Sequence, residues 1–330
     1  QEAMLIQFLW VERKTDPKGL DLGKGHTTRI DHWDEESGSP SWRAFQLAFQ
    51  LVVIESLGNP TSIYRKELDL LWFPTGGGKT EAYLSLSAFE IIHKRLKYGD
   101  EGAGTRVLIR YTLRLLTQQQ FERCAVLICV LEQMRKSQPV LGTLPIRLGL
   151  WVGPDTPNKL SSPLDKSPGA IELAQQTLDD SIPSNPFVLL SCPHCNTKLV
   201  PDRRNTSAHY GFEVDNSRFQ MFCPDTNCIL HQRGSGHFGI PVSMIDEDLY
   251  NNPPTILIGT IDKFARMAFQ PQSRIFLGTK PVSIPEMPSQ EPVEVIAPGL
   301  IIQDELHLIT GPLGSIAGVY EAAIDTIIEN

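Results

Sequence analysis

Short apolar runs and longer segments with helical spacing alternate along the chain, as expected for strands separated by helices. The apolar runs that predict strands lie at residues 68–73, 106–110, 145–152, 255–259 and 299–304. The segments with apolar positions three or four residues apart, which predict helices, lie at residues 42–55, 80–97 and 113–134. The segment at 42–55 is apolar enough to predict a largely buried helix. The alternation as a whole predicts the α/β class, with a doubly wound and mostly parallel sheet.

The middle of the chain interrupts this alternation. Between the third and fourth predicted strands the sequence becomes polar and rich in proline, serine and asparagine. We interpret this region as an insertion in an α/β core and predict four parts: an N-terminal extension at 1–41, the first part of the core at 42–153, the insertion at 154–253 and the second part of the core at 254–330. A second proline-rich stretch, at 271–298, predicts a long surface connection.

Composition adds broad limits to this picture. A chain of 330 residues can bury a sizeable core, and its apolar and charged fractions are those of an ordinary soluble protein. The formal net charge of −8 does not favour nucleic-acid binding, although an acidic domain can carry a local basic groove. No apolar stretch reaches the ~18 residues of a membrane span, and no signal peptide is visible, which predicts a cytoplasmic protein without membrane partners. Since the chain begins with Gln1, we expect a fragment or a processed chain.

A glycine-rich turn between the first predicted strand and the following helix is a candidate phosphate site. The turn and the helix start contain Gly76, Gly77, Gly78, Lys79 and Thr80. The glycines allow backbone N–H groups to approach a phosphate closely, and the helix points its positive end towards it. Lys79 could then reach the β and γ phosphate oxygens of ATP, and Thr80 could hold Mg²⁺. The alternative is an incidental glycine-rich turn, but the flanking strand and helix favour a nucleotide site.

An acidic pair, Asp304 and Glu305, ends the last predicted strand. Asp304 is suited to ordering Mg²⁺ from its outer coordination sphere, and Glu305 is suited to acting as the general base that positions the attacking water. The alternative is a solvated pair at a helix end, which the preceding apolar run disfavours. His307 has two interpretations: it couples the nucleotide to the nucleic-acid side, or it is an ordinary polar residue with satisfied hydrogen bonds.

Two polar residues upstream are candidates for contact with the nucleotide. Arg43 and Gln46 lie at the start of the helix predicted at 42–55. The Gln46 side chain has both a donor and an acceptor, with which it could recognise the edge of adenine. The alternative is a polar residue on a helix surface. We favour the adenine contact because the segment precedes the glycine-rich turn at a suitable distance.

The cysteines predict a metal site. Four of the six form two close pairs: Cys192, Cys195, Cys223 and Cys228. The pattern C-x₂-C…C-x₄-C is typical of a zinc ribbon, in which four thiolates hold Zn²⁺ tetrahedrally, and we predict a structural Zn²⁺ that stabilises a polar insertion. Unrelated buried cysteines or two disulfides would not explain both close pairs. His194 and His231 lie near enough to be rival ligands, whereas Cys124 and Cys129 fall in an apolar helix and are predicted core residues.

The two nucleotide motifs resemble those of superfamily 2 helicases and translocases of the Asp-Glu-x-His type. Phe73 replaces the glycine that opens the strict phosphate-loop motif, a departure common in helicase-like ATPases. Residues 111–118 resemble motif Ia, with Tyr111 in place of proline, residues 258–264 resemble motif Ib, and residues 43–46 resemble the Q-motif. The order of these motifs matches that family across about residues 42–310. The resemblance implies a RecA-like fold with an inserted zinc-ribbon-like region, and an ATP-hydrolysing activity.

A helicase or translocase must hold DNA by its backbone, because it moves across any sequence. Thr112, Arg114, Thr260 and Lys263 follow predicted strands at or near helix starts, where hydroxyl groups, amides and cations can meet phosphates. We therefore predict these residues as nucleic-acid contacts. The alternative for Arg114 and Lys263 is a solvated surface cation.

A closer likeness is carried by four longer strings. Residues 42–49, 71–84, 110–117 and 302–314 are similar to the DrmA helicases of the DISARM anti-phage system. That resemblance implies a role in bacterial anti-phage defence, phage DNA as the substrate, a protein partner resembling DrmB and a location in the bacterial cytoplasm.

Two functions of different classes remain. The first is the first RecA-like domain of an ATP-dependent DNA helicase or translocase. The second is a zinc-stabilised nucleic-acid-binding module in which ATP acts as a switch or scaffold without powering movement. The sequence ends soon after the acidic pair, without a second RecA-like domain and its arginine finger. Because such an arginine contributes ~10³–10⁵ in rate, we expect this segment alone to bind ATP but to hydrolyse it slowly.

Overall fold

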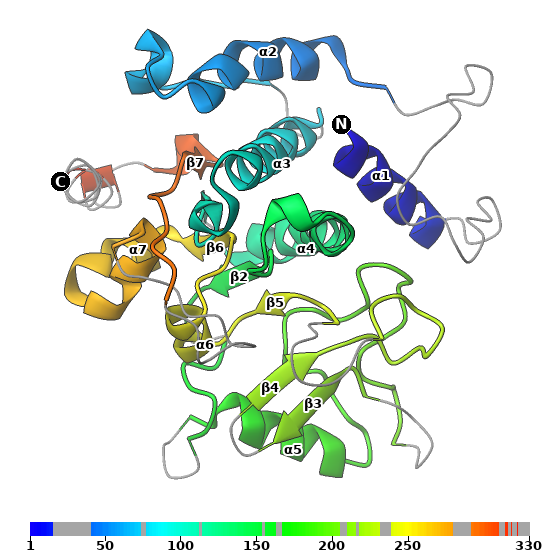
Figure 1. Cartoon of the computed structure of the whole chain (residues 1–330). Coiled ribbons are helices and arrows are strands. Elements are labelled where there is room, and N and C mark those ends of the chain that lie inside the picture. The colour runs from blue at the N-terminus through cyan, green and yellow to red at the C-terminus, as the bar shows by residue number, and fades with distance from the viewer. Residues whose placement is uncertain are drawn as a thin grey trace, which may run out of the picture.

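A parallel sheet lies at the centre of the computed structural model (Figure 1). The structure describes residues 1–15, 41–73, 77–111, 114–153, 156–162, 167–204, 210–215, 218–231, 239–279 and 292–309, with isolated positions beyond. Five strands of these ranges form the sheet, in the order β5-β2-β6-β1-β7, and all four neighbouring pairs are parallel. The strands are β1 (Val107–Tyr111), β2 (Leu148–Trp151), β5 (Val242–Ser243), β6 (Ile256–Thr260) and β7 (Leu300–Gln303). The predicted α/β class with a parallel sheet is therefore confirmed.

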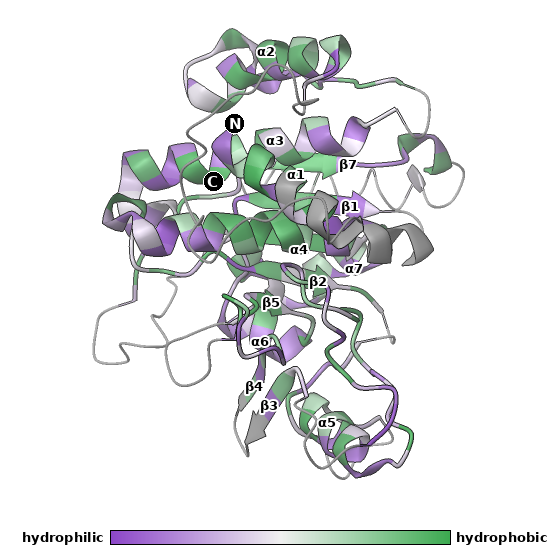
Figure 2. Ribbon diagram, turned by 90° about the vertical axis from the view of Figure 1, so that its right-hand side faces the viewer, coloured by the Kyte–Doolittle hydropathy of each residue, from purple (hydrophilic) through white to green (hydrophobic). Residues whose placement is uncertain are grey.

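Helices cover both faces of this sheet. Val107 and Ile109 of β1 pack in one cluster with α3 (Lys79–Tyr98) and α4 (Arg114–Ser137). Leu108 points to the other face, where it packs with residues of α6 (Asp246–Asn251) and α7 (Ile261–Ala265). All residues of β1, β2 and β6 are buried, which explains why these strands are nearly continuous apolar runs. The hydropathy colouring shows the mainly apolar α4 beside the sheet (Figure 2).

Two predictions about the segment before α3 were wrong. Helix α2 (Ala44–Gly58) lies along α3 and buries only one face, since Leu51 is 65% and Val52 66% exposed. An apolar pattern without clear periodicity cannot show which face stays in water. Within the described residues, 68–73 form no strand, and Trp72 is 90% exposed. A strand forms only where another strand pairs with it, and none of the described strands pairs with this segment.

The cysteine-rich part of the chain forms a small unit below the sheet in the view of Figure 1. It contains α5 (Ala170–Asp179) and an antiparallel pair, β3 (Phe212–Asp215) and β4 (Arg218–Met221). Its interior is aromatic, with the ring of Phe187 packed against those of Phe212 and Phe219. The strand β5 lies within the predicted insertion range but pairs with β2 of the main sheet.

The N-terminal helix α1 (Glu2–Thr15) contacts both parts of the molecule. It packs along α4, where Met4 is buried. Its buried Trp10 meets the ring of His194 edge to face, with 4.6 Å between the ring centroids. Helix α1 therefore connects the sheet's helical layer to the cysteine-rich unit.

Short 3₁₀ helices complete the described elements. They are η1 (Ile63–Lys66), η2 (Gly99–Gly102), η3 (Pro139–Leu141), η4 (Met267–Phe269), η5 (Pro271–Leu277) and η6 (Leu306–Leu308). Phe276 and Leu277 of η5 are buried against the sheet, so the start of the stretch predicted as a surface connection belongs to the core. Residues 280–291 of that stretch lie outside the described residues. None of the helices in the described part of the chain combines the length and the apolar character that crossing a membrane requires.

The packing of β2 predicts the effect of one substitution. A Cβ atom added at Gly149 would lie 2.5 Å from Pro254 Cγ and 2.7 Å from Leu249 Cδ2. Because the proline ring cannot rotate away, Gly149→Ala should lower the free energy of unfolding by about 1–3 kcal/mol, measured by urea denaturation. Gly58→Ala is the control, since its Cβ would meet only Phe89 at 3.6 Å. Equal urea midpoints for the two variants would contradict the packing described for β2.

Candidate nucleotide and zinc sites

The glycine-rich turn leads directly into α3. Gly76 lies outside the described residues, which resume at Gly77. Gly78 has a φ of 91°, a left-handed conformation that favours glycine, and a Cβ there would lie 2.7 Å from Gln46 Nε2. Lys79 begins α3 and Thr80 is buried in its first turn. The positive end of a 20-residue helix therefore faces the turn, which fits a site for phosphate.

Arg43 and Gln46 hold this turn from α2. Arg43 Nη1 donates to the carbonyl of Gly77 at 2.7 Å, and Gln46 Nε2 donates to the carbonyl of Gly78 at 2.8 Å. Gln46 Oε1 accepts a hydrogen bond from the backbone N–H of Arg43 at 2.9 Å. Both ends of the Gln46 amide thus contact the protein itself. The adenine contact inferred from sequence stays a prediction, and the structure adds a role that the sequence did not indicate.

The two halves of the predicted nucleotide site lie together. The hydroxyl of Tyr83 lies 3.3 Å from Thr80 Oγ1 and 3.3 Å from Asp304 Oδ2. Thr80 is in the first turn of α3 and Asp304 directly follows β7, so the fold joins segments that are distant in the sequence. A hydroxyl and a carboxylate are the oxygen ligands that Mg²⁺ prefers, so these residues fit that ion.

Tyr83 itself was not predicted. The available signal was its position three residues after Thr80, which places both side chains on one face of a helix. Its hydroxyl also lies 3.0 Å from Tyr111 Oη and 3.2 Å from Gln120 Oε1. Burial, and next the charge of Asp304, raise the pKa of Tyr83. Burial, and next the neighbouring Tyr83, raise the pKa of Tyr111, so both phenols stay protonated at neutral pH.

The acidic pair has an unusual backbone. The N–H of Asp304 donates to the carbonyl of Arg110 at 3.1 Å, and Asp304 Oδ1 accepts from the N–H of Glu305 at 2.8 Å. Glu305 has φ 51° and ψ 42°, a left-handed conformation that costs a non-glycine residue on the order of 1 kcal/mol. The exposed His307 places Nδ1 3.2 Å from Glu305 Oε2. This contact puts His307 beside the predicted general base, and its coupling role stays a prediction.

The residues predicted to bind nucleic acid differ in their surroundings. Thr112 and the side chain of Arg114 lie outside the described residues. Thr260 is 1% and Lys263 is 7% exposed. Lys263 Nζ lies 2.6 Å from Asp246 Oδ2, so its charge is paired inside the protein. Thr260 ends β6 and Lys263 lies in the short helix α7, and both side chains are turned into the protein. The phosphate contacts of these two residues stay predictions.

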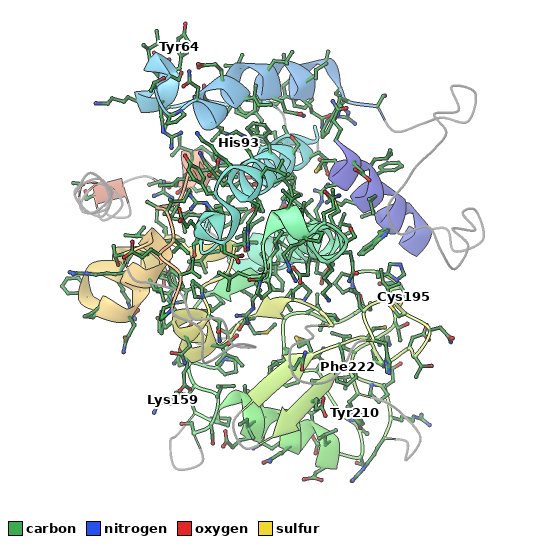
Figure 3. The ribbon with its side chains drawn as sticks, in the orientation of Figure 1. Tyr64, His93, Lys159, Cys195, Tyr210 and Phe222 are labelled. Carbon is green, nitrogen blue, oxygen red and sulfur yellow. The ribbon has the colours of Figure 1, made fainter. Side chains whose placement is uncertain are left out.

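The four predicted zinc ligands lie together in the cysteine-rich unit, where Figure 3 labels Cys195. The Sγ atoms of Cys192, Cys195, Cys223 and Cys228 all lie within 4.8 Å of one another. Cys192 and Cys228 are 3.8 Å apart, and Cys195 and Cys223 are 3.4 Å apart. Zn–S bonds of about 2.3 Å in a tetrahedron separate the sulfurs by about 3.8 Å, so the cluster fits Zn²⁺. All six cysteines are free thiols, which rules out the disulfide alternative.

The two histidines near the cluster have other partners. His194 Nδ1 lies 3.3 Å from Cys228 Sγ, and its ring packs against Trp10. His231 Nδ1 donates to the carbonyl of Cys223 at 2.6 Å. The histidines therefore support the four sulfurs from outside. Cys124 and Cys129 are fully buried in α4, as predicted for core residues.

The fold and the site together define a class of protein. A parallel sheet with helices on both faces carries a glycine turn and a carboxylate at one edge, which is consistent with a RecA-like nucleotide-binding domain. No family model matches the chain. The chain is 35% identical over 315 residues to the DISARM protein DrmA of Bacillus paralicheniformis.

The alignment to DrmA covers 87% of this chain and 27% of that protein, so the chain spans about a quarter of the length of this curated relative. The relationship to DrmA that the four sequence strings predicted is confirmed, and it extends over most of the chain.

The cysteine cluster predicts bound zinc. We expect the purified chain to contain one Zn²⁺ per molecule, measured by mass spectrometry after dialysis against metal-free buffer, because four thiolates bind the ion tightly. Cys195→Ser should lose the ion in the same dialysis, since it leaves three sulfurs. Cys124→Ala removes a thiol outside the cluster and should retain the metal. Equal zinc contents in the two variants would contradict the assigned ligands.

Proposed function

We propose that the chain is the ATP-binding motor domain of a DrmA-like superfamily 2 DNA helicase or translocase that acts in bacterial anti-phage defence. The observation that carries the proposal is the meeting of Thr80 and Asp304 at the Tyr83 hydroxyl. This arrangement brings a phosphate loop and an acidic pair to one place, as ATP hydrolysis requires. The 35% identity to the DISARM protein DrmA supports the defence role.

Each residue has a defined task in this proposal. Lys79 contacts the β and γ phosphate oxygens, and Thr80 and Asp304 hold the position of the metal from opposite segments. Mg²⁺ supplies neutralisation of the charge on the phosphate oxygens. Glu305 accepts the proton of the attacking water, with its carboxylate next to His307.

DNA is held at the same edge of the sheet in this proposal. The segment that starts with Thr112 and Arg114 directly follows the carboxyl end of β1, and Tyr111 at that end contacts Tyr83. Parallel strands present their carboxyl ends on one edge, so the end of β1 at Tyr111 lies next to Asp304. The buried Thr260 and Lys263 are not needed for it. The bound Zn²⁺ stabilises the cysteine-rich unit, and the longer protein works in the cytoplasm beside a DrmB-like partner.

Nucleotide binding tests the phosphate loop. Lys79→Ala should weaken the affinity for Mg-ATP by about 10- to 100-fold, as expected for the loss of one contact between charged groups. The measurement is fluorescence titration with an ATP analogue. Lys66→Ala, which removes an exposed lysine of η1, is the control and should bind as the wild type does. Equal affinity of the two variants would contradict the site.

Turnover by the longer protein tests the catalytic pair. Glu305→Gln should leave Mg-ATP binding intact and lower DNA-stimulated hydrolysis by about 10²–10⁴, because the amide accepts no proton. Phosphate release is the readout. Single-molecule tracking of the wild-type protein on DNA distinguishes the motor from the ATP-switch alternative. Tight ATP-dependent binding without stepping along DNA would refute the motor.

A further inference from the structure

The Tyr83 hydroxyl joins four structural elements at a single point. It lies 3.0–3.3 Å from oxygens of Thr80 in α3, Tyr111 in β1, Gln120 in α4 and Asp304 after β7. Tyr83 is buried, and its ring sits among residues of the main core. None of the roles given above uses this hydroxyl.

We propose that Tyr83 is a positioning residue, which fixes the Asp304 carboxylate relative to Thr80 and is itself oriented by the hydroxyl of Tyr111. The proposal rests on the proposed function, because it concerns the metal–phosphate site of that ATPase.

The donors and acceptors available around Tyr83 support a chain of hydrogen bonds that ends on Asp304. A phenol has one O–H to donate and lone pairs with which to accept. Among the neighbours of Tyr83, the carboxylate of Asp304 is the charged acceptor, so it takes the strongest hydrogen bond. The O–H of Tyr111 then donates to Tyr83 Oη across 3.0 Å. The resulting chain runs from Tyr111 to Tyr83 to Asp304.

Both oxygens of the Asp304 carboxylate are thereby held. Oδ1 accepts the N–H of Glu305, and Oδ2 accepts the hydroxyl of Tyr83. The first contact belongs to the same short turn as Asp304, whereas the second comes from α3, the helix that carries Thr80. The Tyr83 hydroxyl is therefore the contact that fixes the carboxylate against the phosphate loop. Without it, the distance between the Thr80 hydroxyl and the Asp304 carboxylate, which orders the ion from its outer coordination sphere, is free to vary, so the affinity for Mg²⁺ falls.

The substitution Tyr83→Phe tests this role, because it removes one oxygen and keeps the ring. We expect the Mg²⁺ concentration that half-saturates ATP binding to rise by about tenfold, as expected for one hydrogen bond to a charged group. ATP binding in EDTA should change by less than about twofold, since the phosphate loop itself is unchanged. Tyr64→Phe is the matched control, because Tyr64 is an exposed tyrosine of η1, at the top of the molecule in Figure 3, and is not among the neighbours of the Tyr83 hydroxyl.

A second variant tests the chain of hydroxyls. Tyr111→Phe should also raise the Mg²⁺ concentration that half-saturates ATP binding. The double variant should raise this concentration by less than the product of the two single increases, because both residues act through the same carboxylate. Multiplicative effects would overturn the link from Tyr111. An equal loss of ATP affinity with and without Mg²⁺ in Tyr83→Phe would reveal a merely structural residue and would overturn the proposal.

The outcomes separate the two levels of inference. In one outcome the wild type binds Mg-ATP, Lys79→Ala binds it more weakly, and Tyr83→Phe depends on Mg²⁺ as Tyr64→Phe does. In that case only the positioning role of Tyr83 fails. If Lys79→Ala binds Mg-ATP as the wild type does, the proposed function fails and the positioning role fails with it.

Discussion

The parallel pairing of β7 with β1 is the constraint on which the site depends. In this register Arg110 lies opposite Gln303, and Asp304 continues the pairing by donating its N–H to the carbonyl of Arg110. Asp304 and Tyr111 therefore emerge side by side at the carboxyl edge of the sheet, and both reach the hydroxyl of Tyr83. A shift of one residue would turn Asp304 to the other face of the sheet, away from α3. The buried residues of β1 and the half-buried apolar residues of β7, which pack on both faces of the sheet, prevent such a shift.

The cysteine-rich unit depends on a different kind of constraint. Its described elements are one helix and a two-stranded pair, which alone offer little apolar area to bury. Zn²⁺ held by the four thiolates would close two distant segments on one another and would supply the missing stability. The contact of Trp10 with His194, next to the cluster, then ties α1 to this unit, while Met4 ties the same helix to α4. The geometry of the cysteine cluster and the packing of the N-terminal helix are therefore linked through the contact between these two rings.

The sequence predicted what is local and repetitive, and missed what arises from tertiary contact. The strands at 107–111 and 256–260 were predictable because both faces of a central parallel strand are apolar. The cysteine cluster was predictable because its spacing already brings each pair together. The burial of Lys263 was not, since its partner Asp246 comes from a separate helix. The role of Tyr83 was hidden for the same reason, because its neighbours belong to four elements. Residues 68–73 have the composition of a strand, yet a strand also needs a neighbour.

The contacts of Arg43 and Gln46 explain how the glycine-rich turn can be ready for an anion. In a trans peptide the carbonyl and the following N–H point in opposite directions. Arg43 holds the carbonyl of Gly77 towards α2, which turns the N–H of Gly78 to the other side of the loop. Gln46 does the same to the carbonyl of Gly78, and so orients the N–H of Lys79. Two side chains that donate to carbonyls of the turn therefore aim the backbone donors that a phosphate needs. The glycines allow the backbone of the turn several conformations, and the contacts from α2 select the one in which its N–H groups are oriented for an anion.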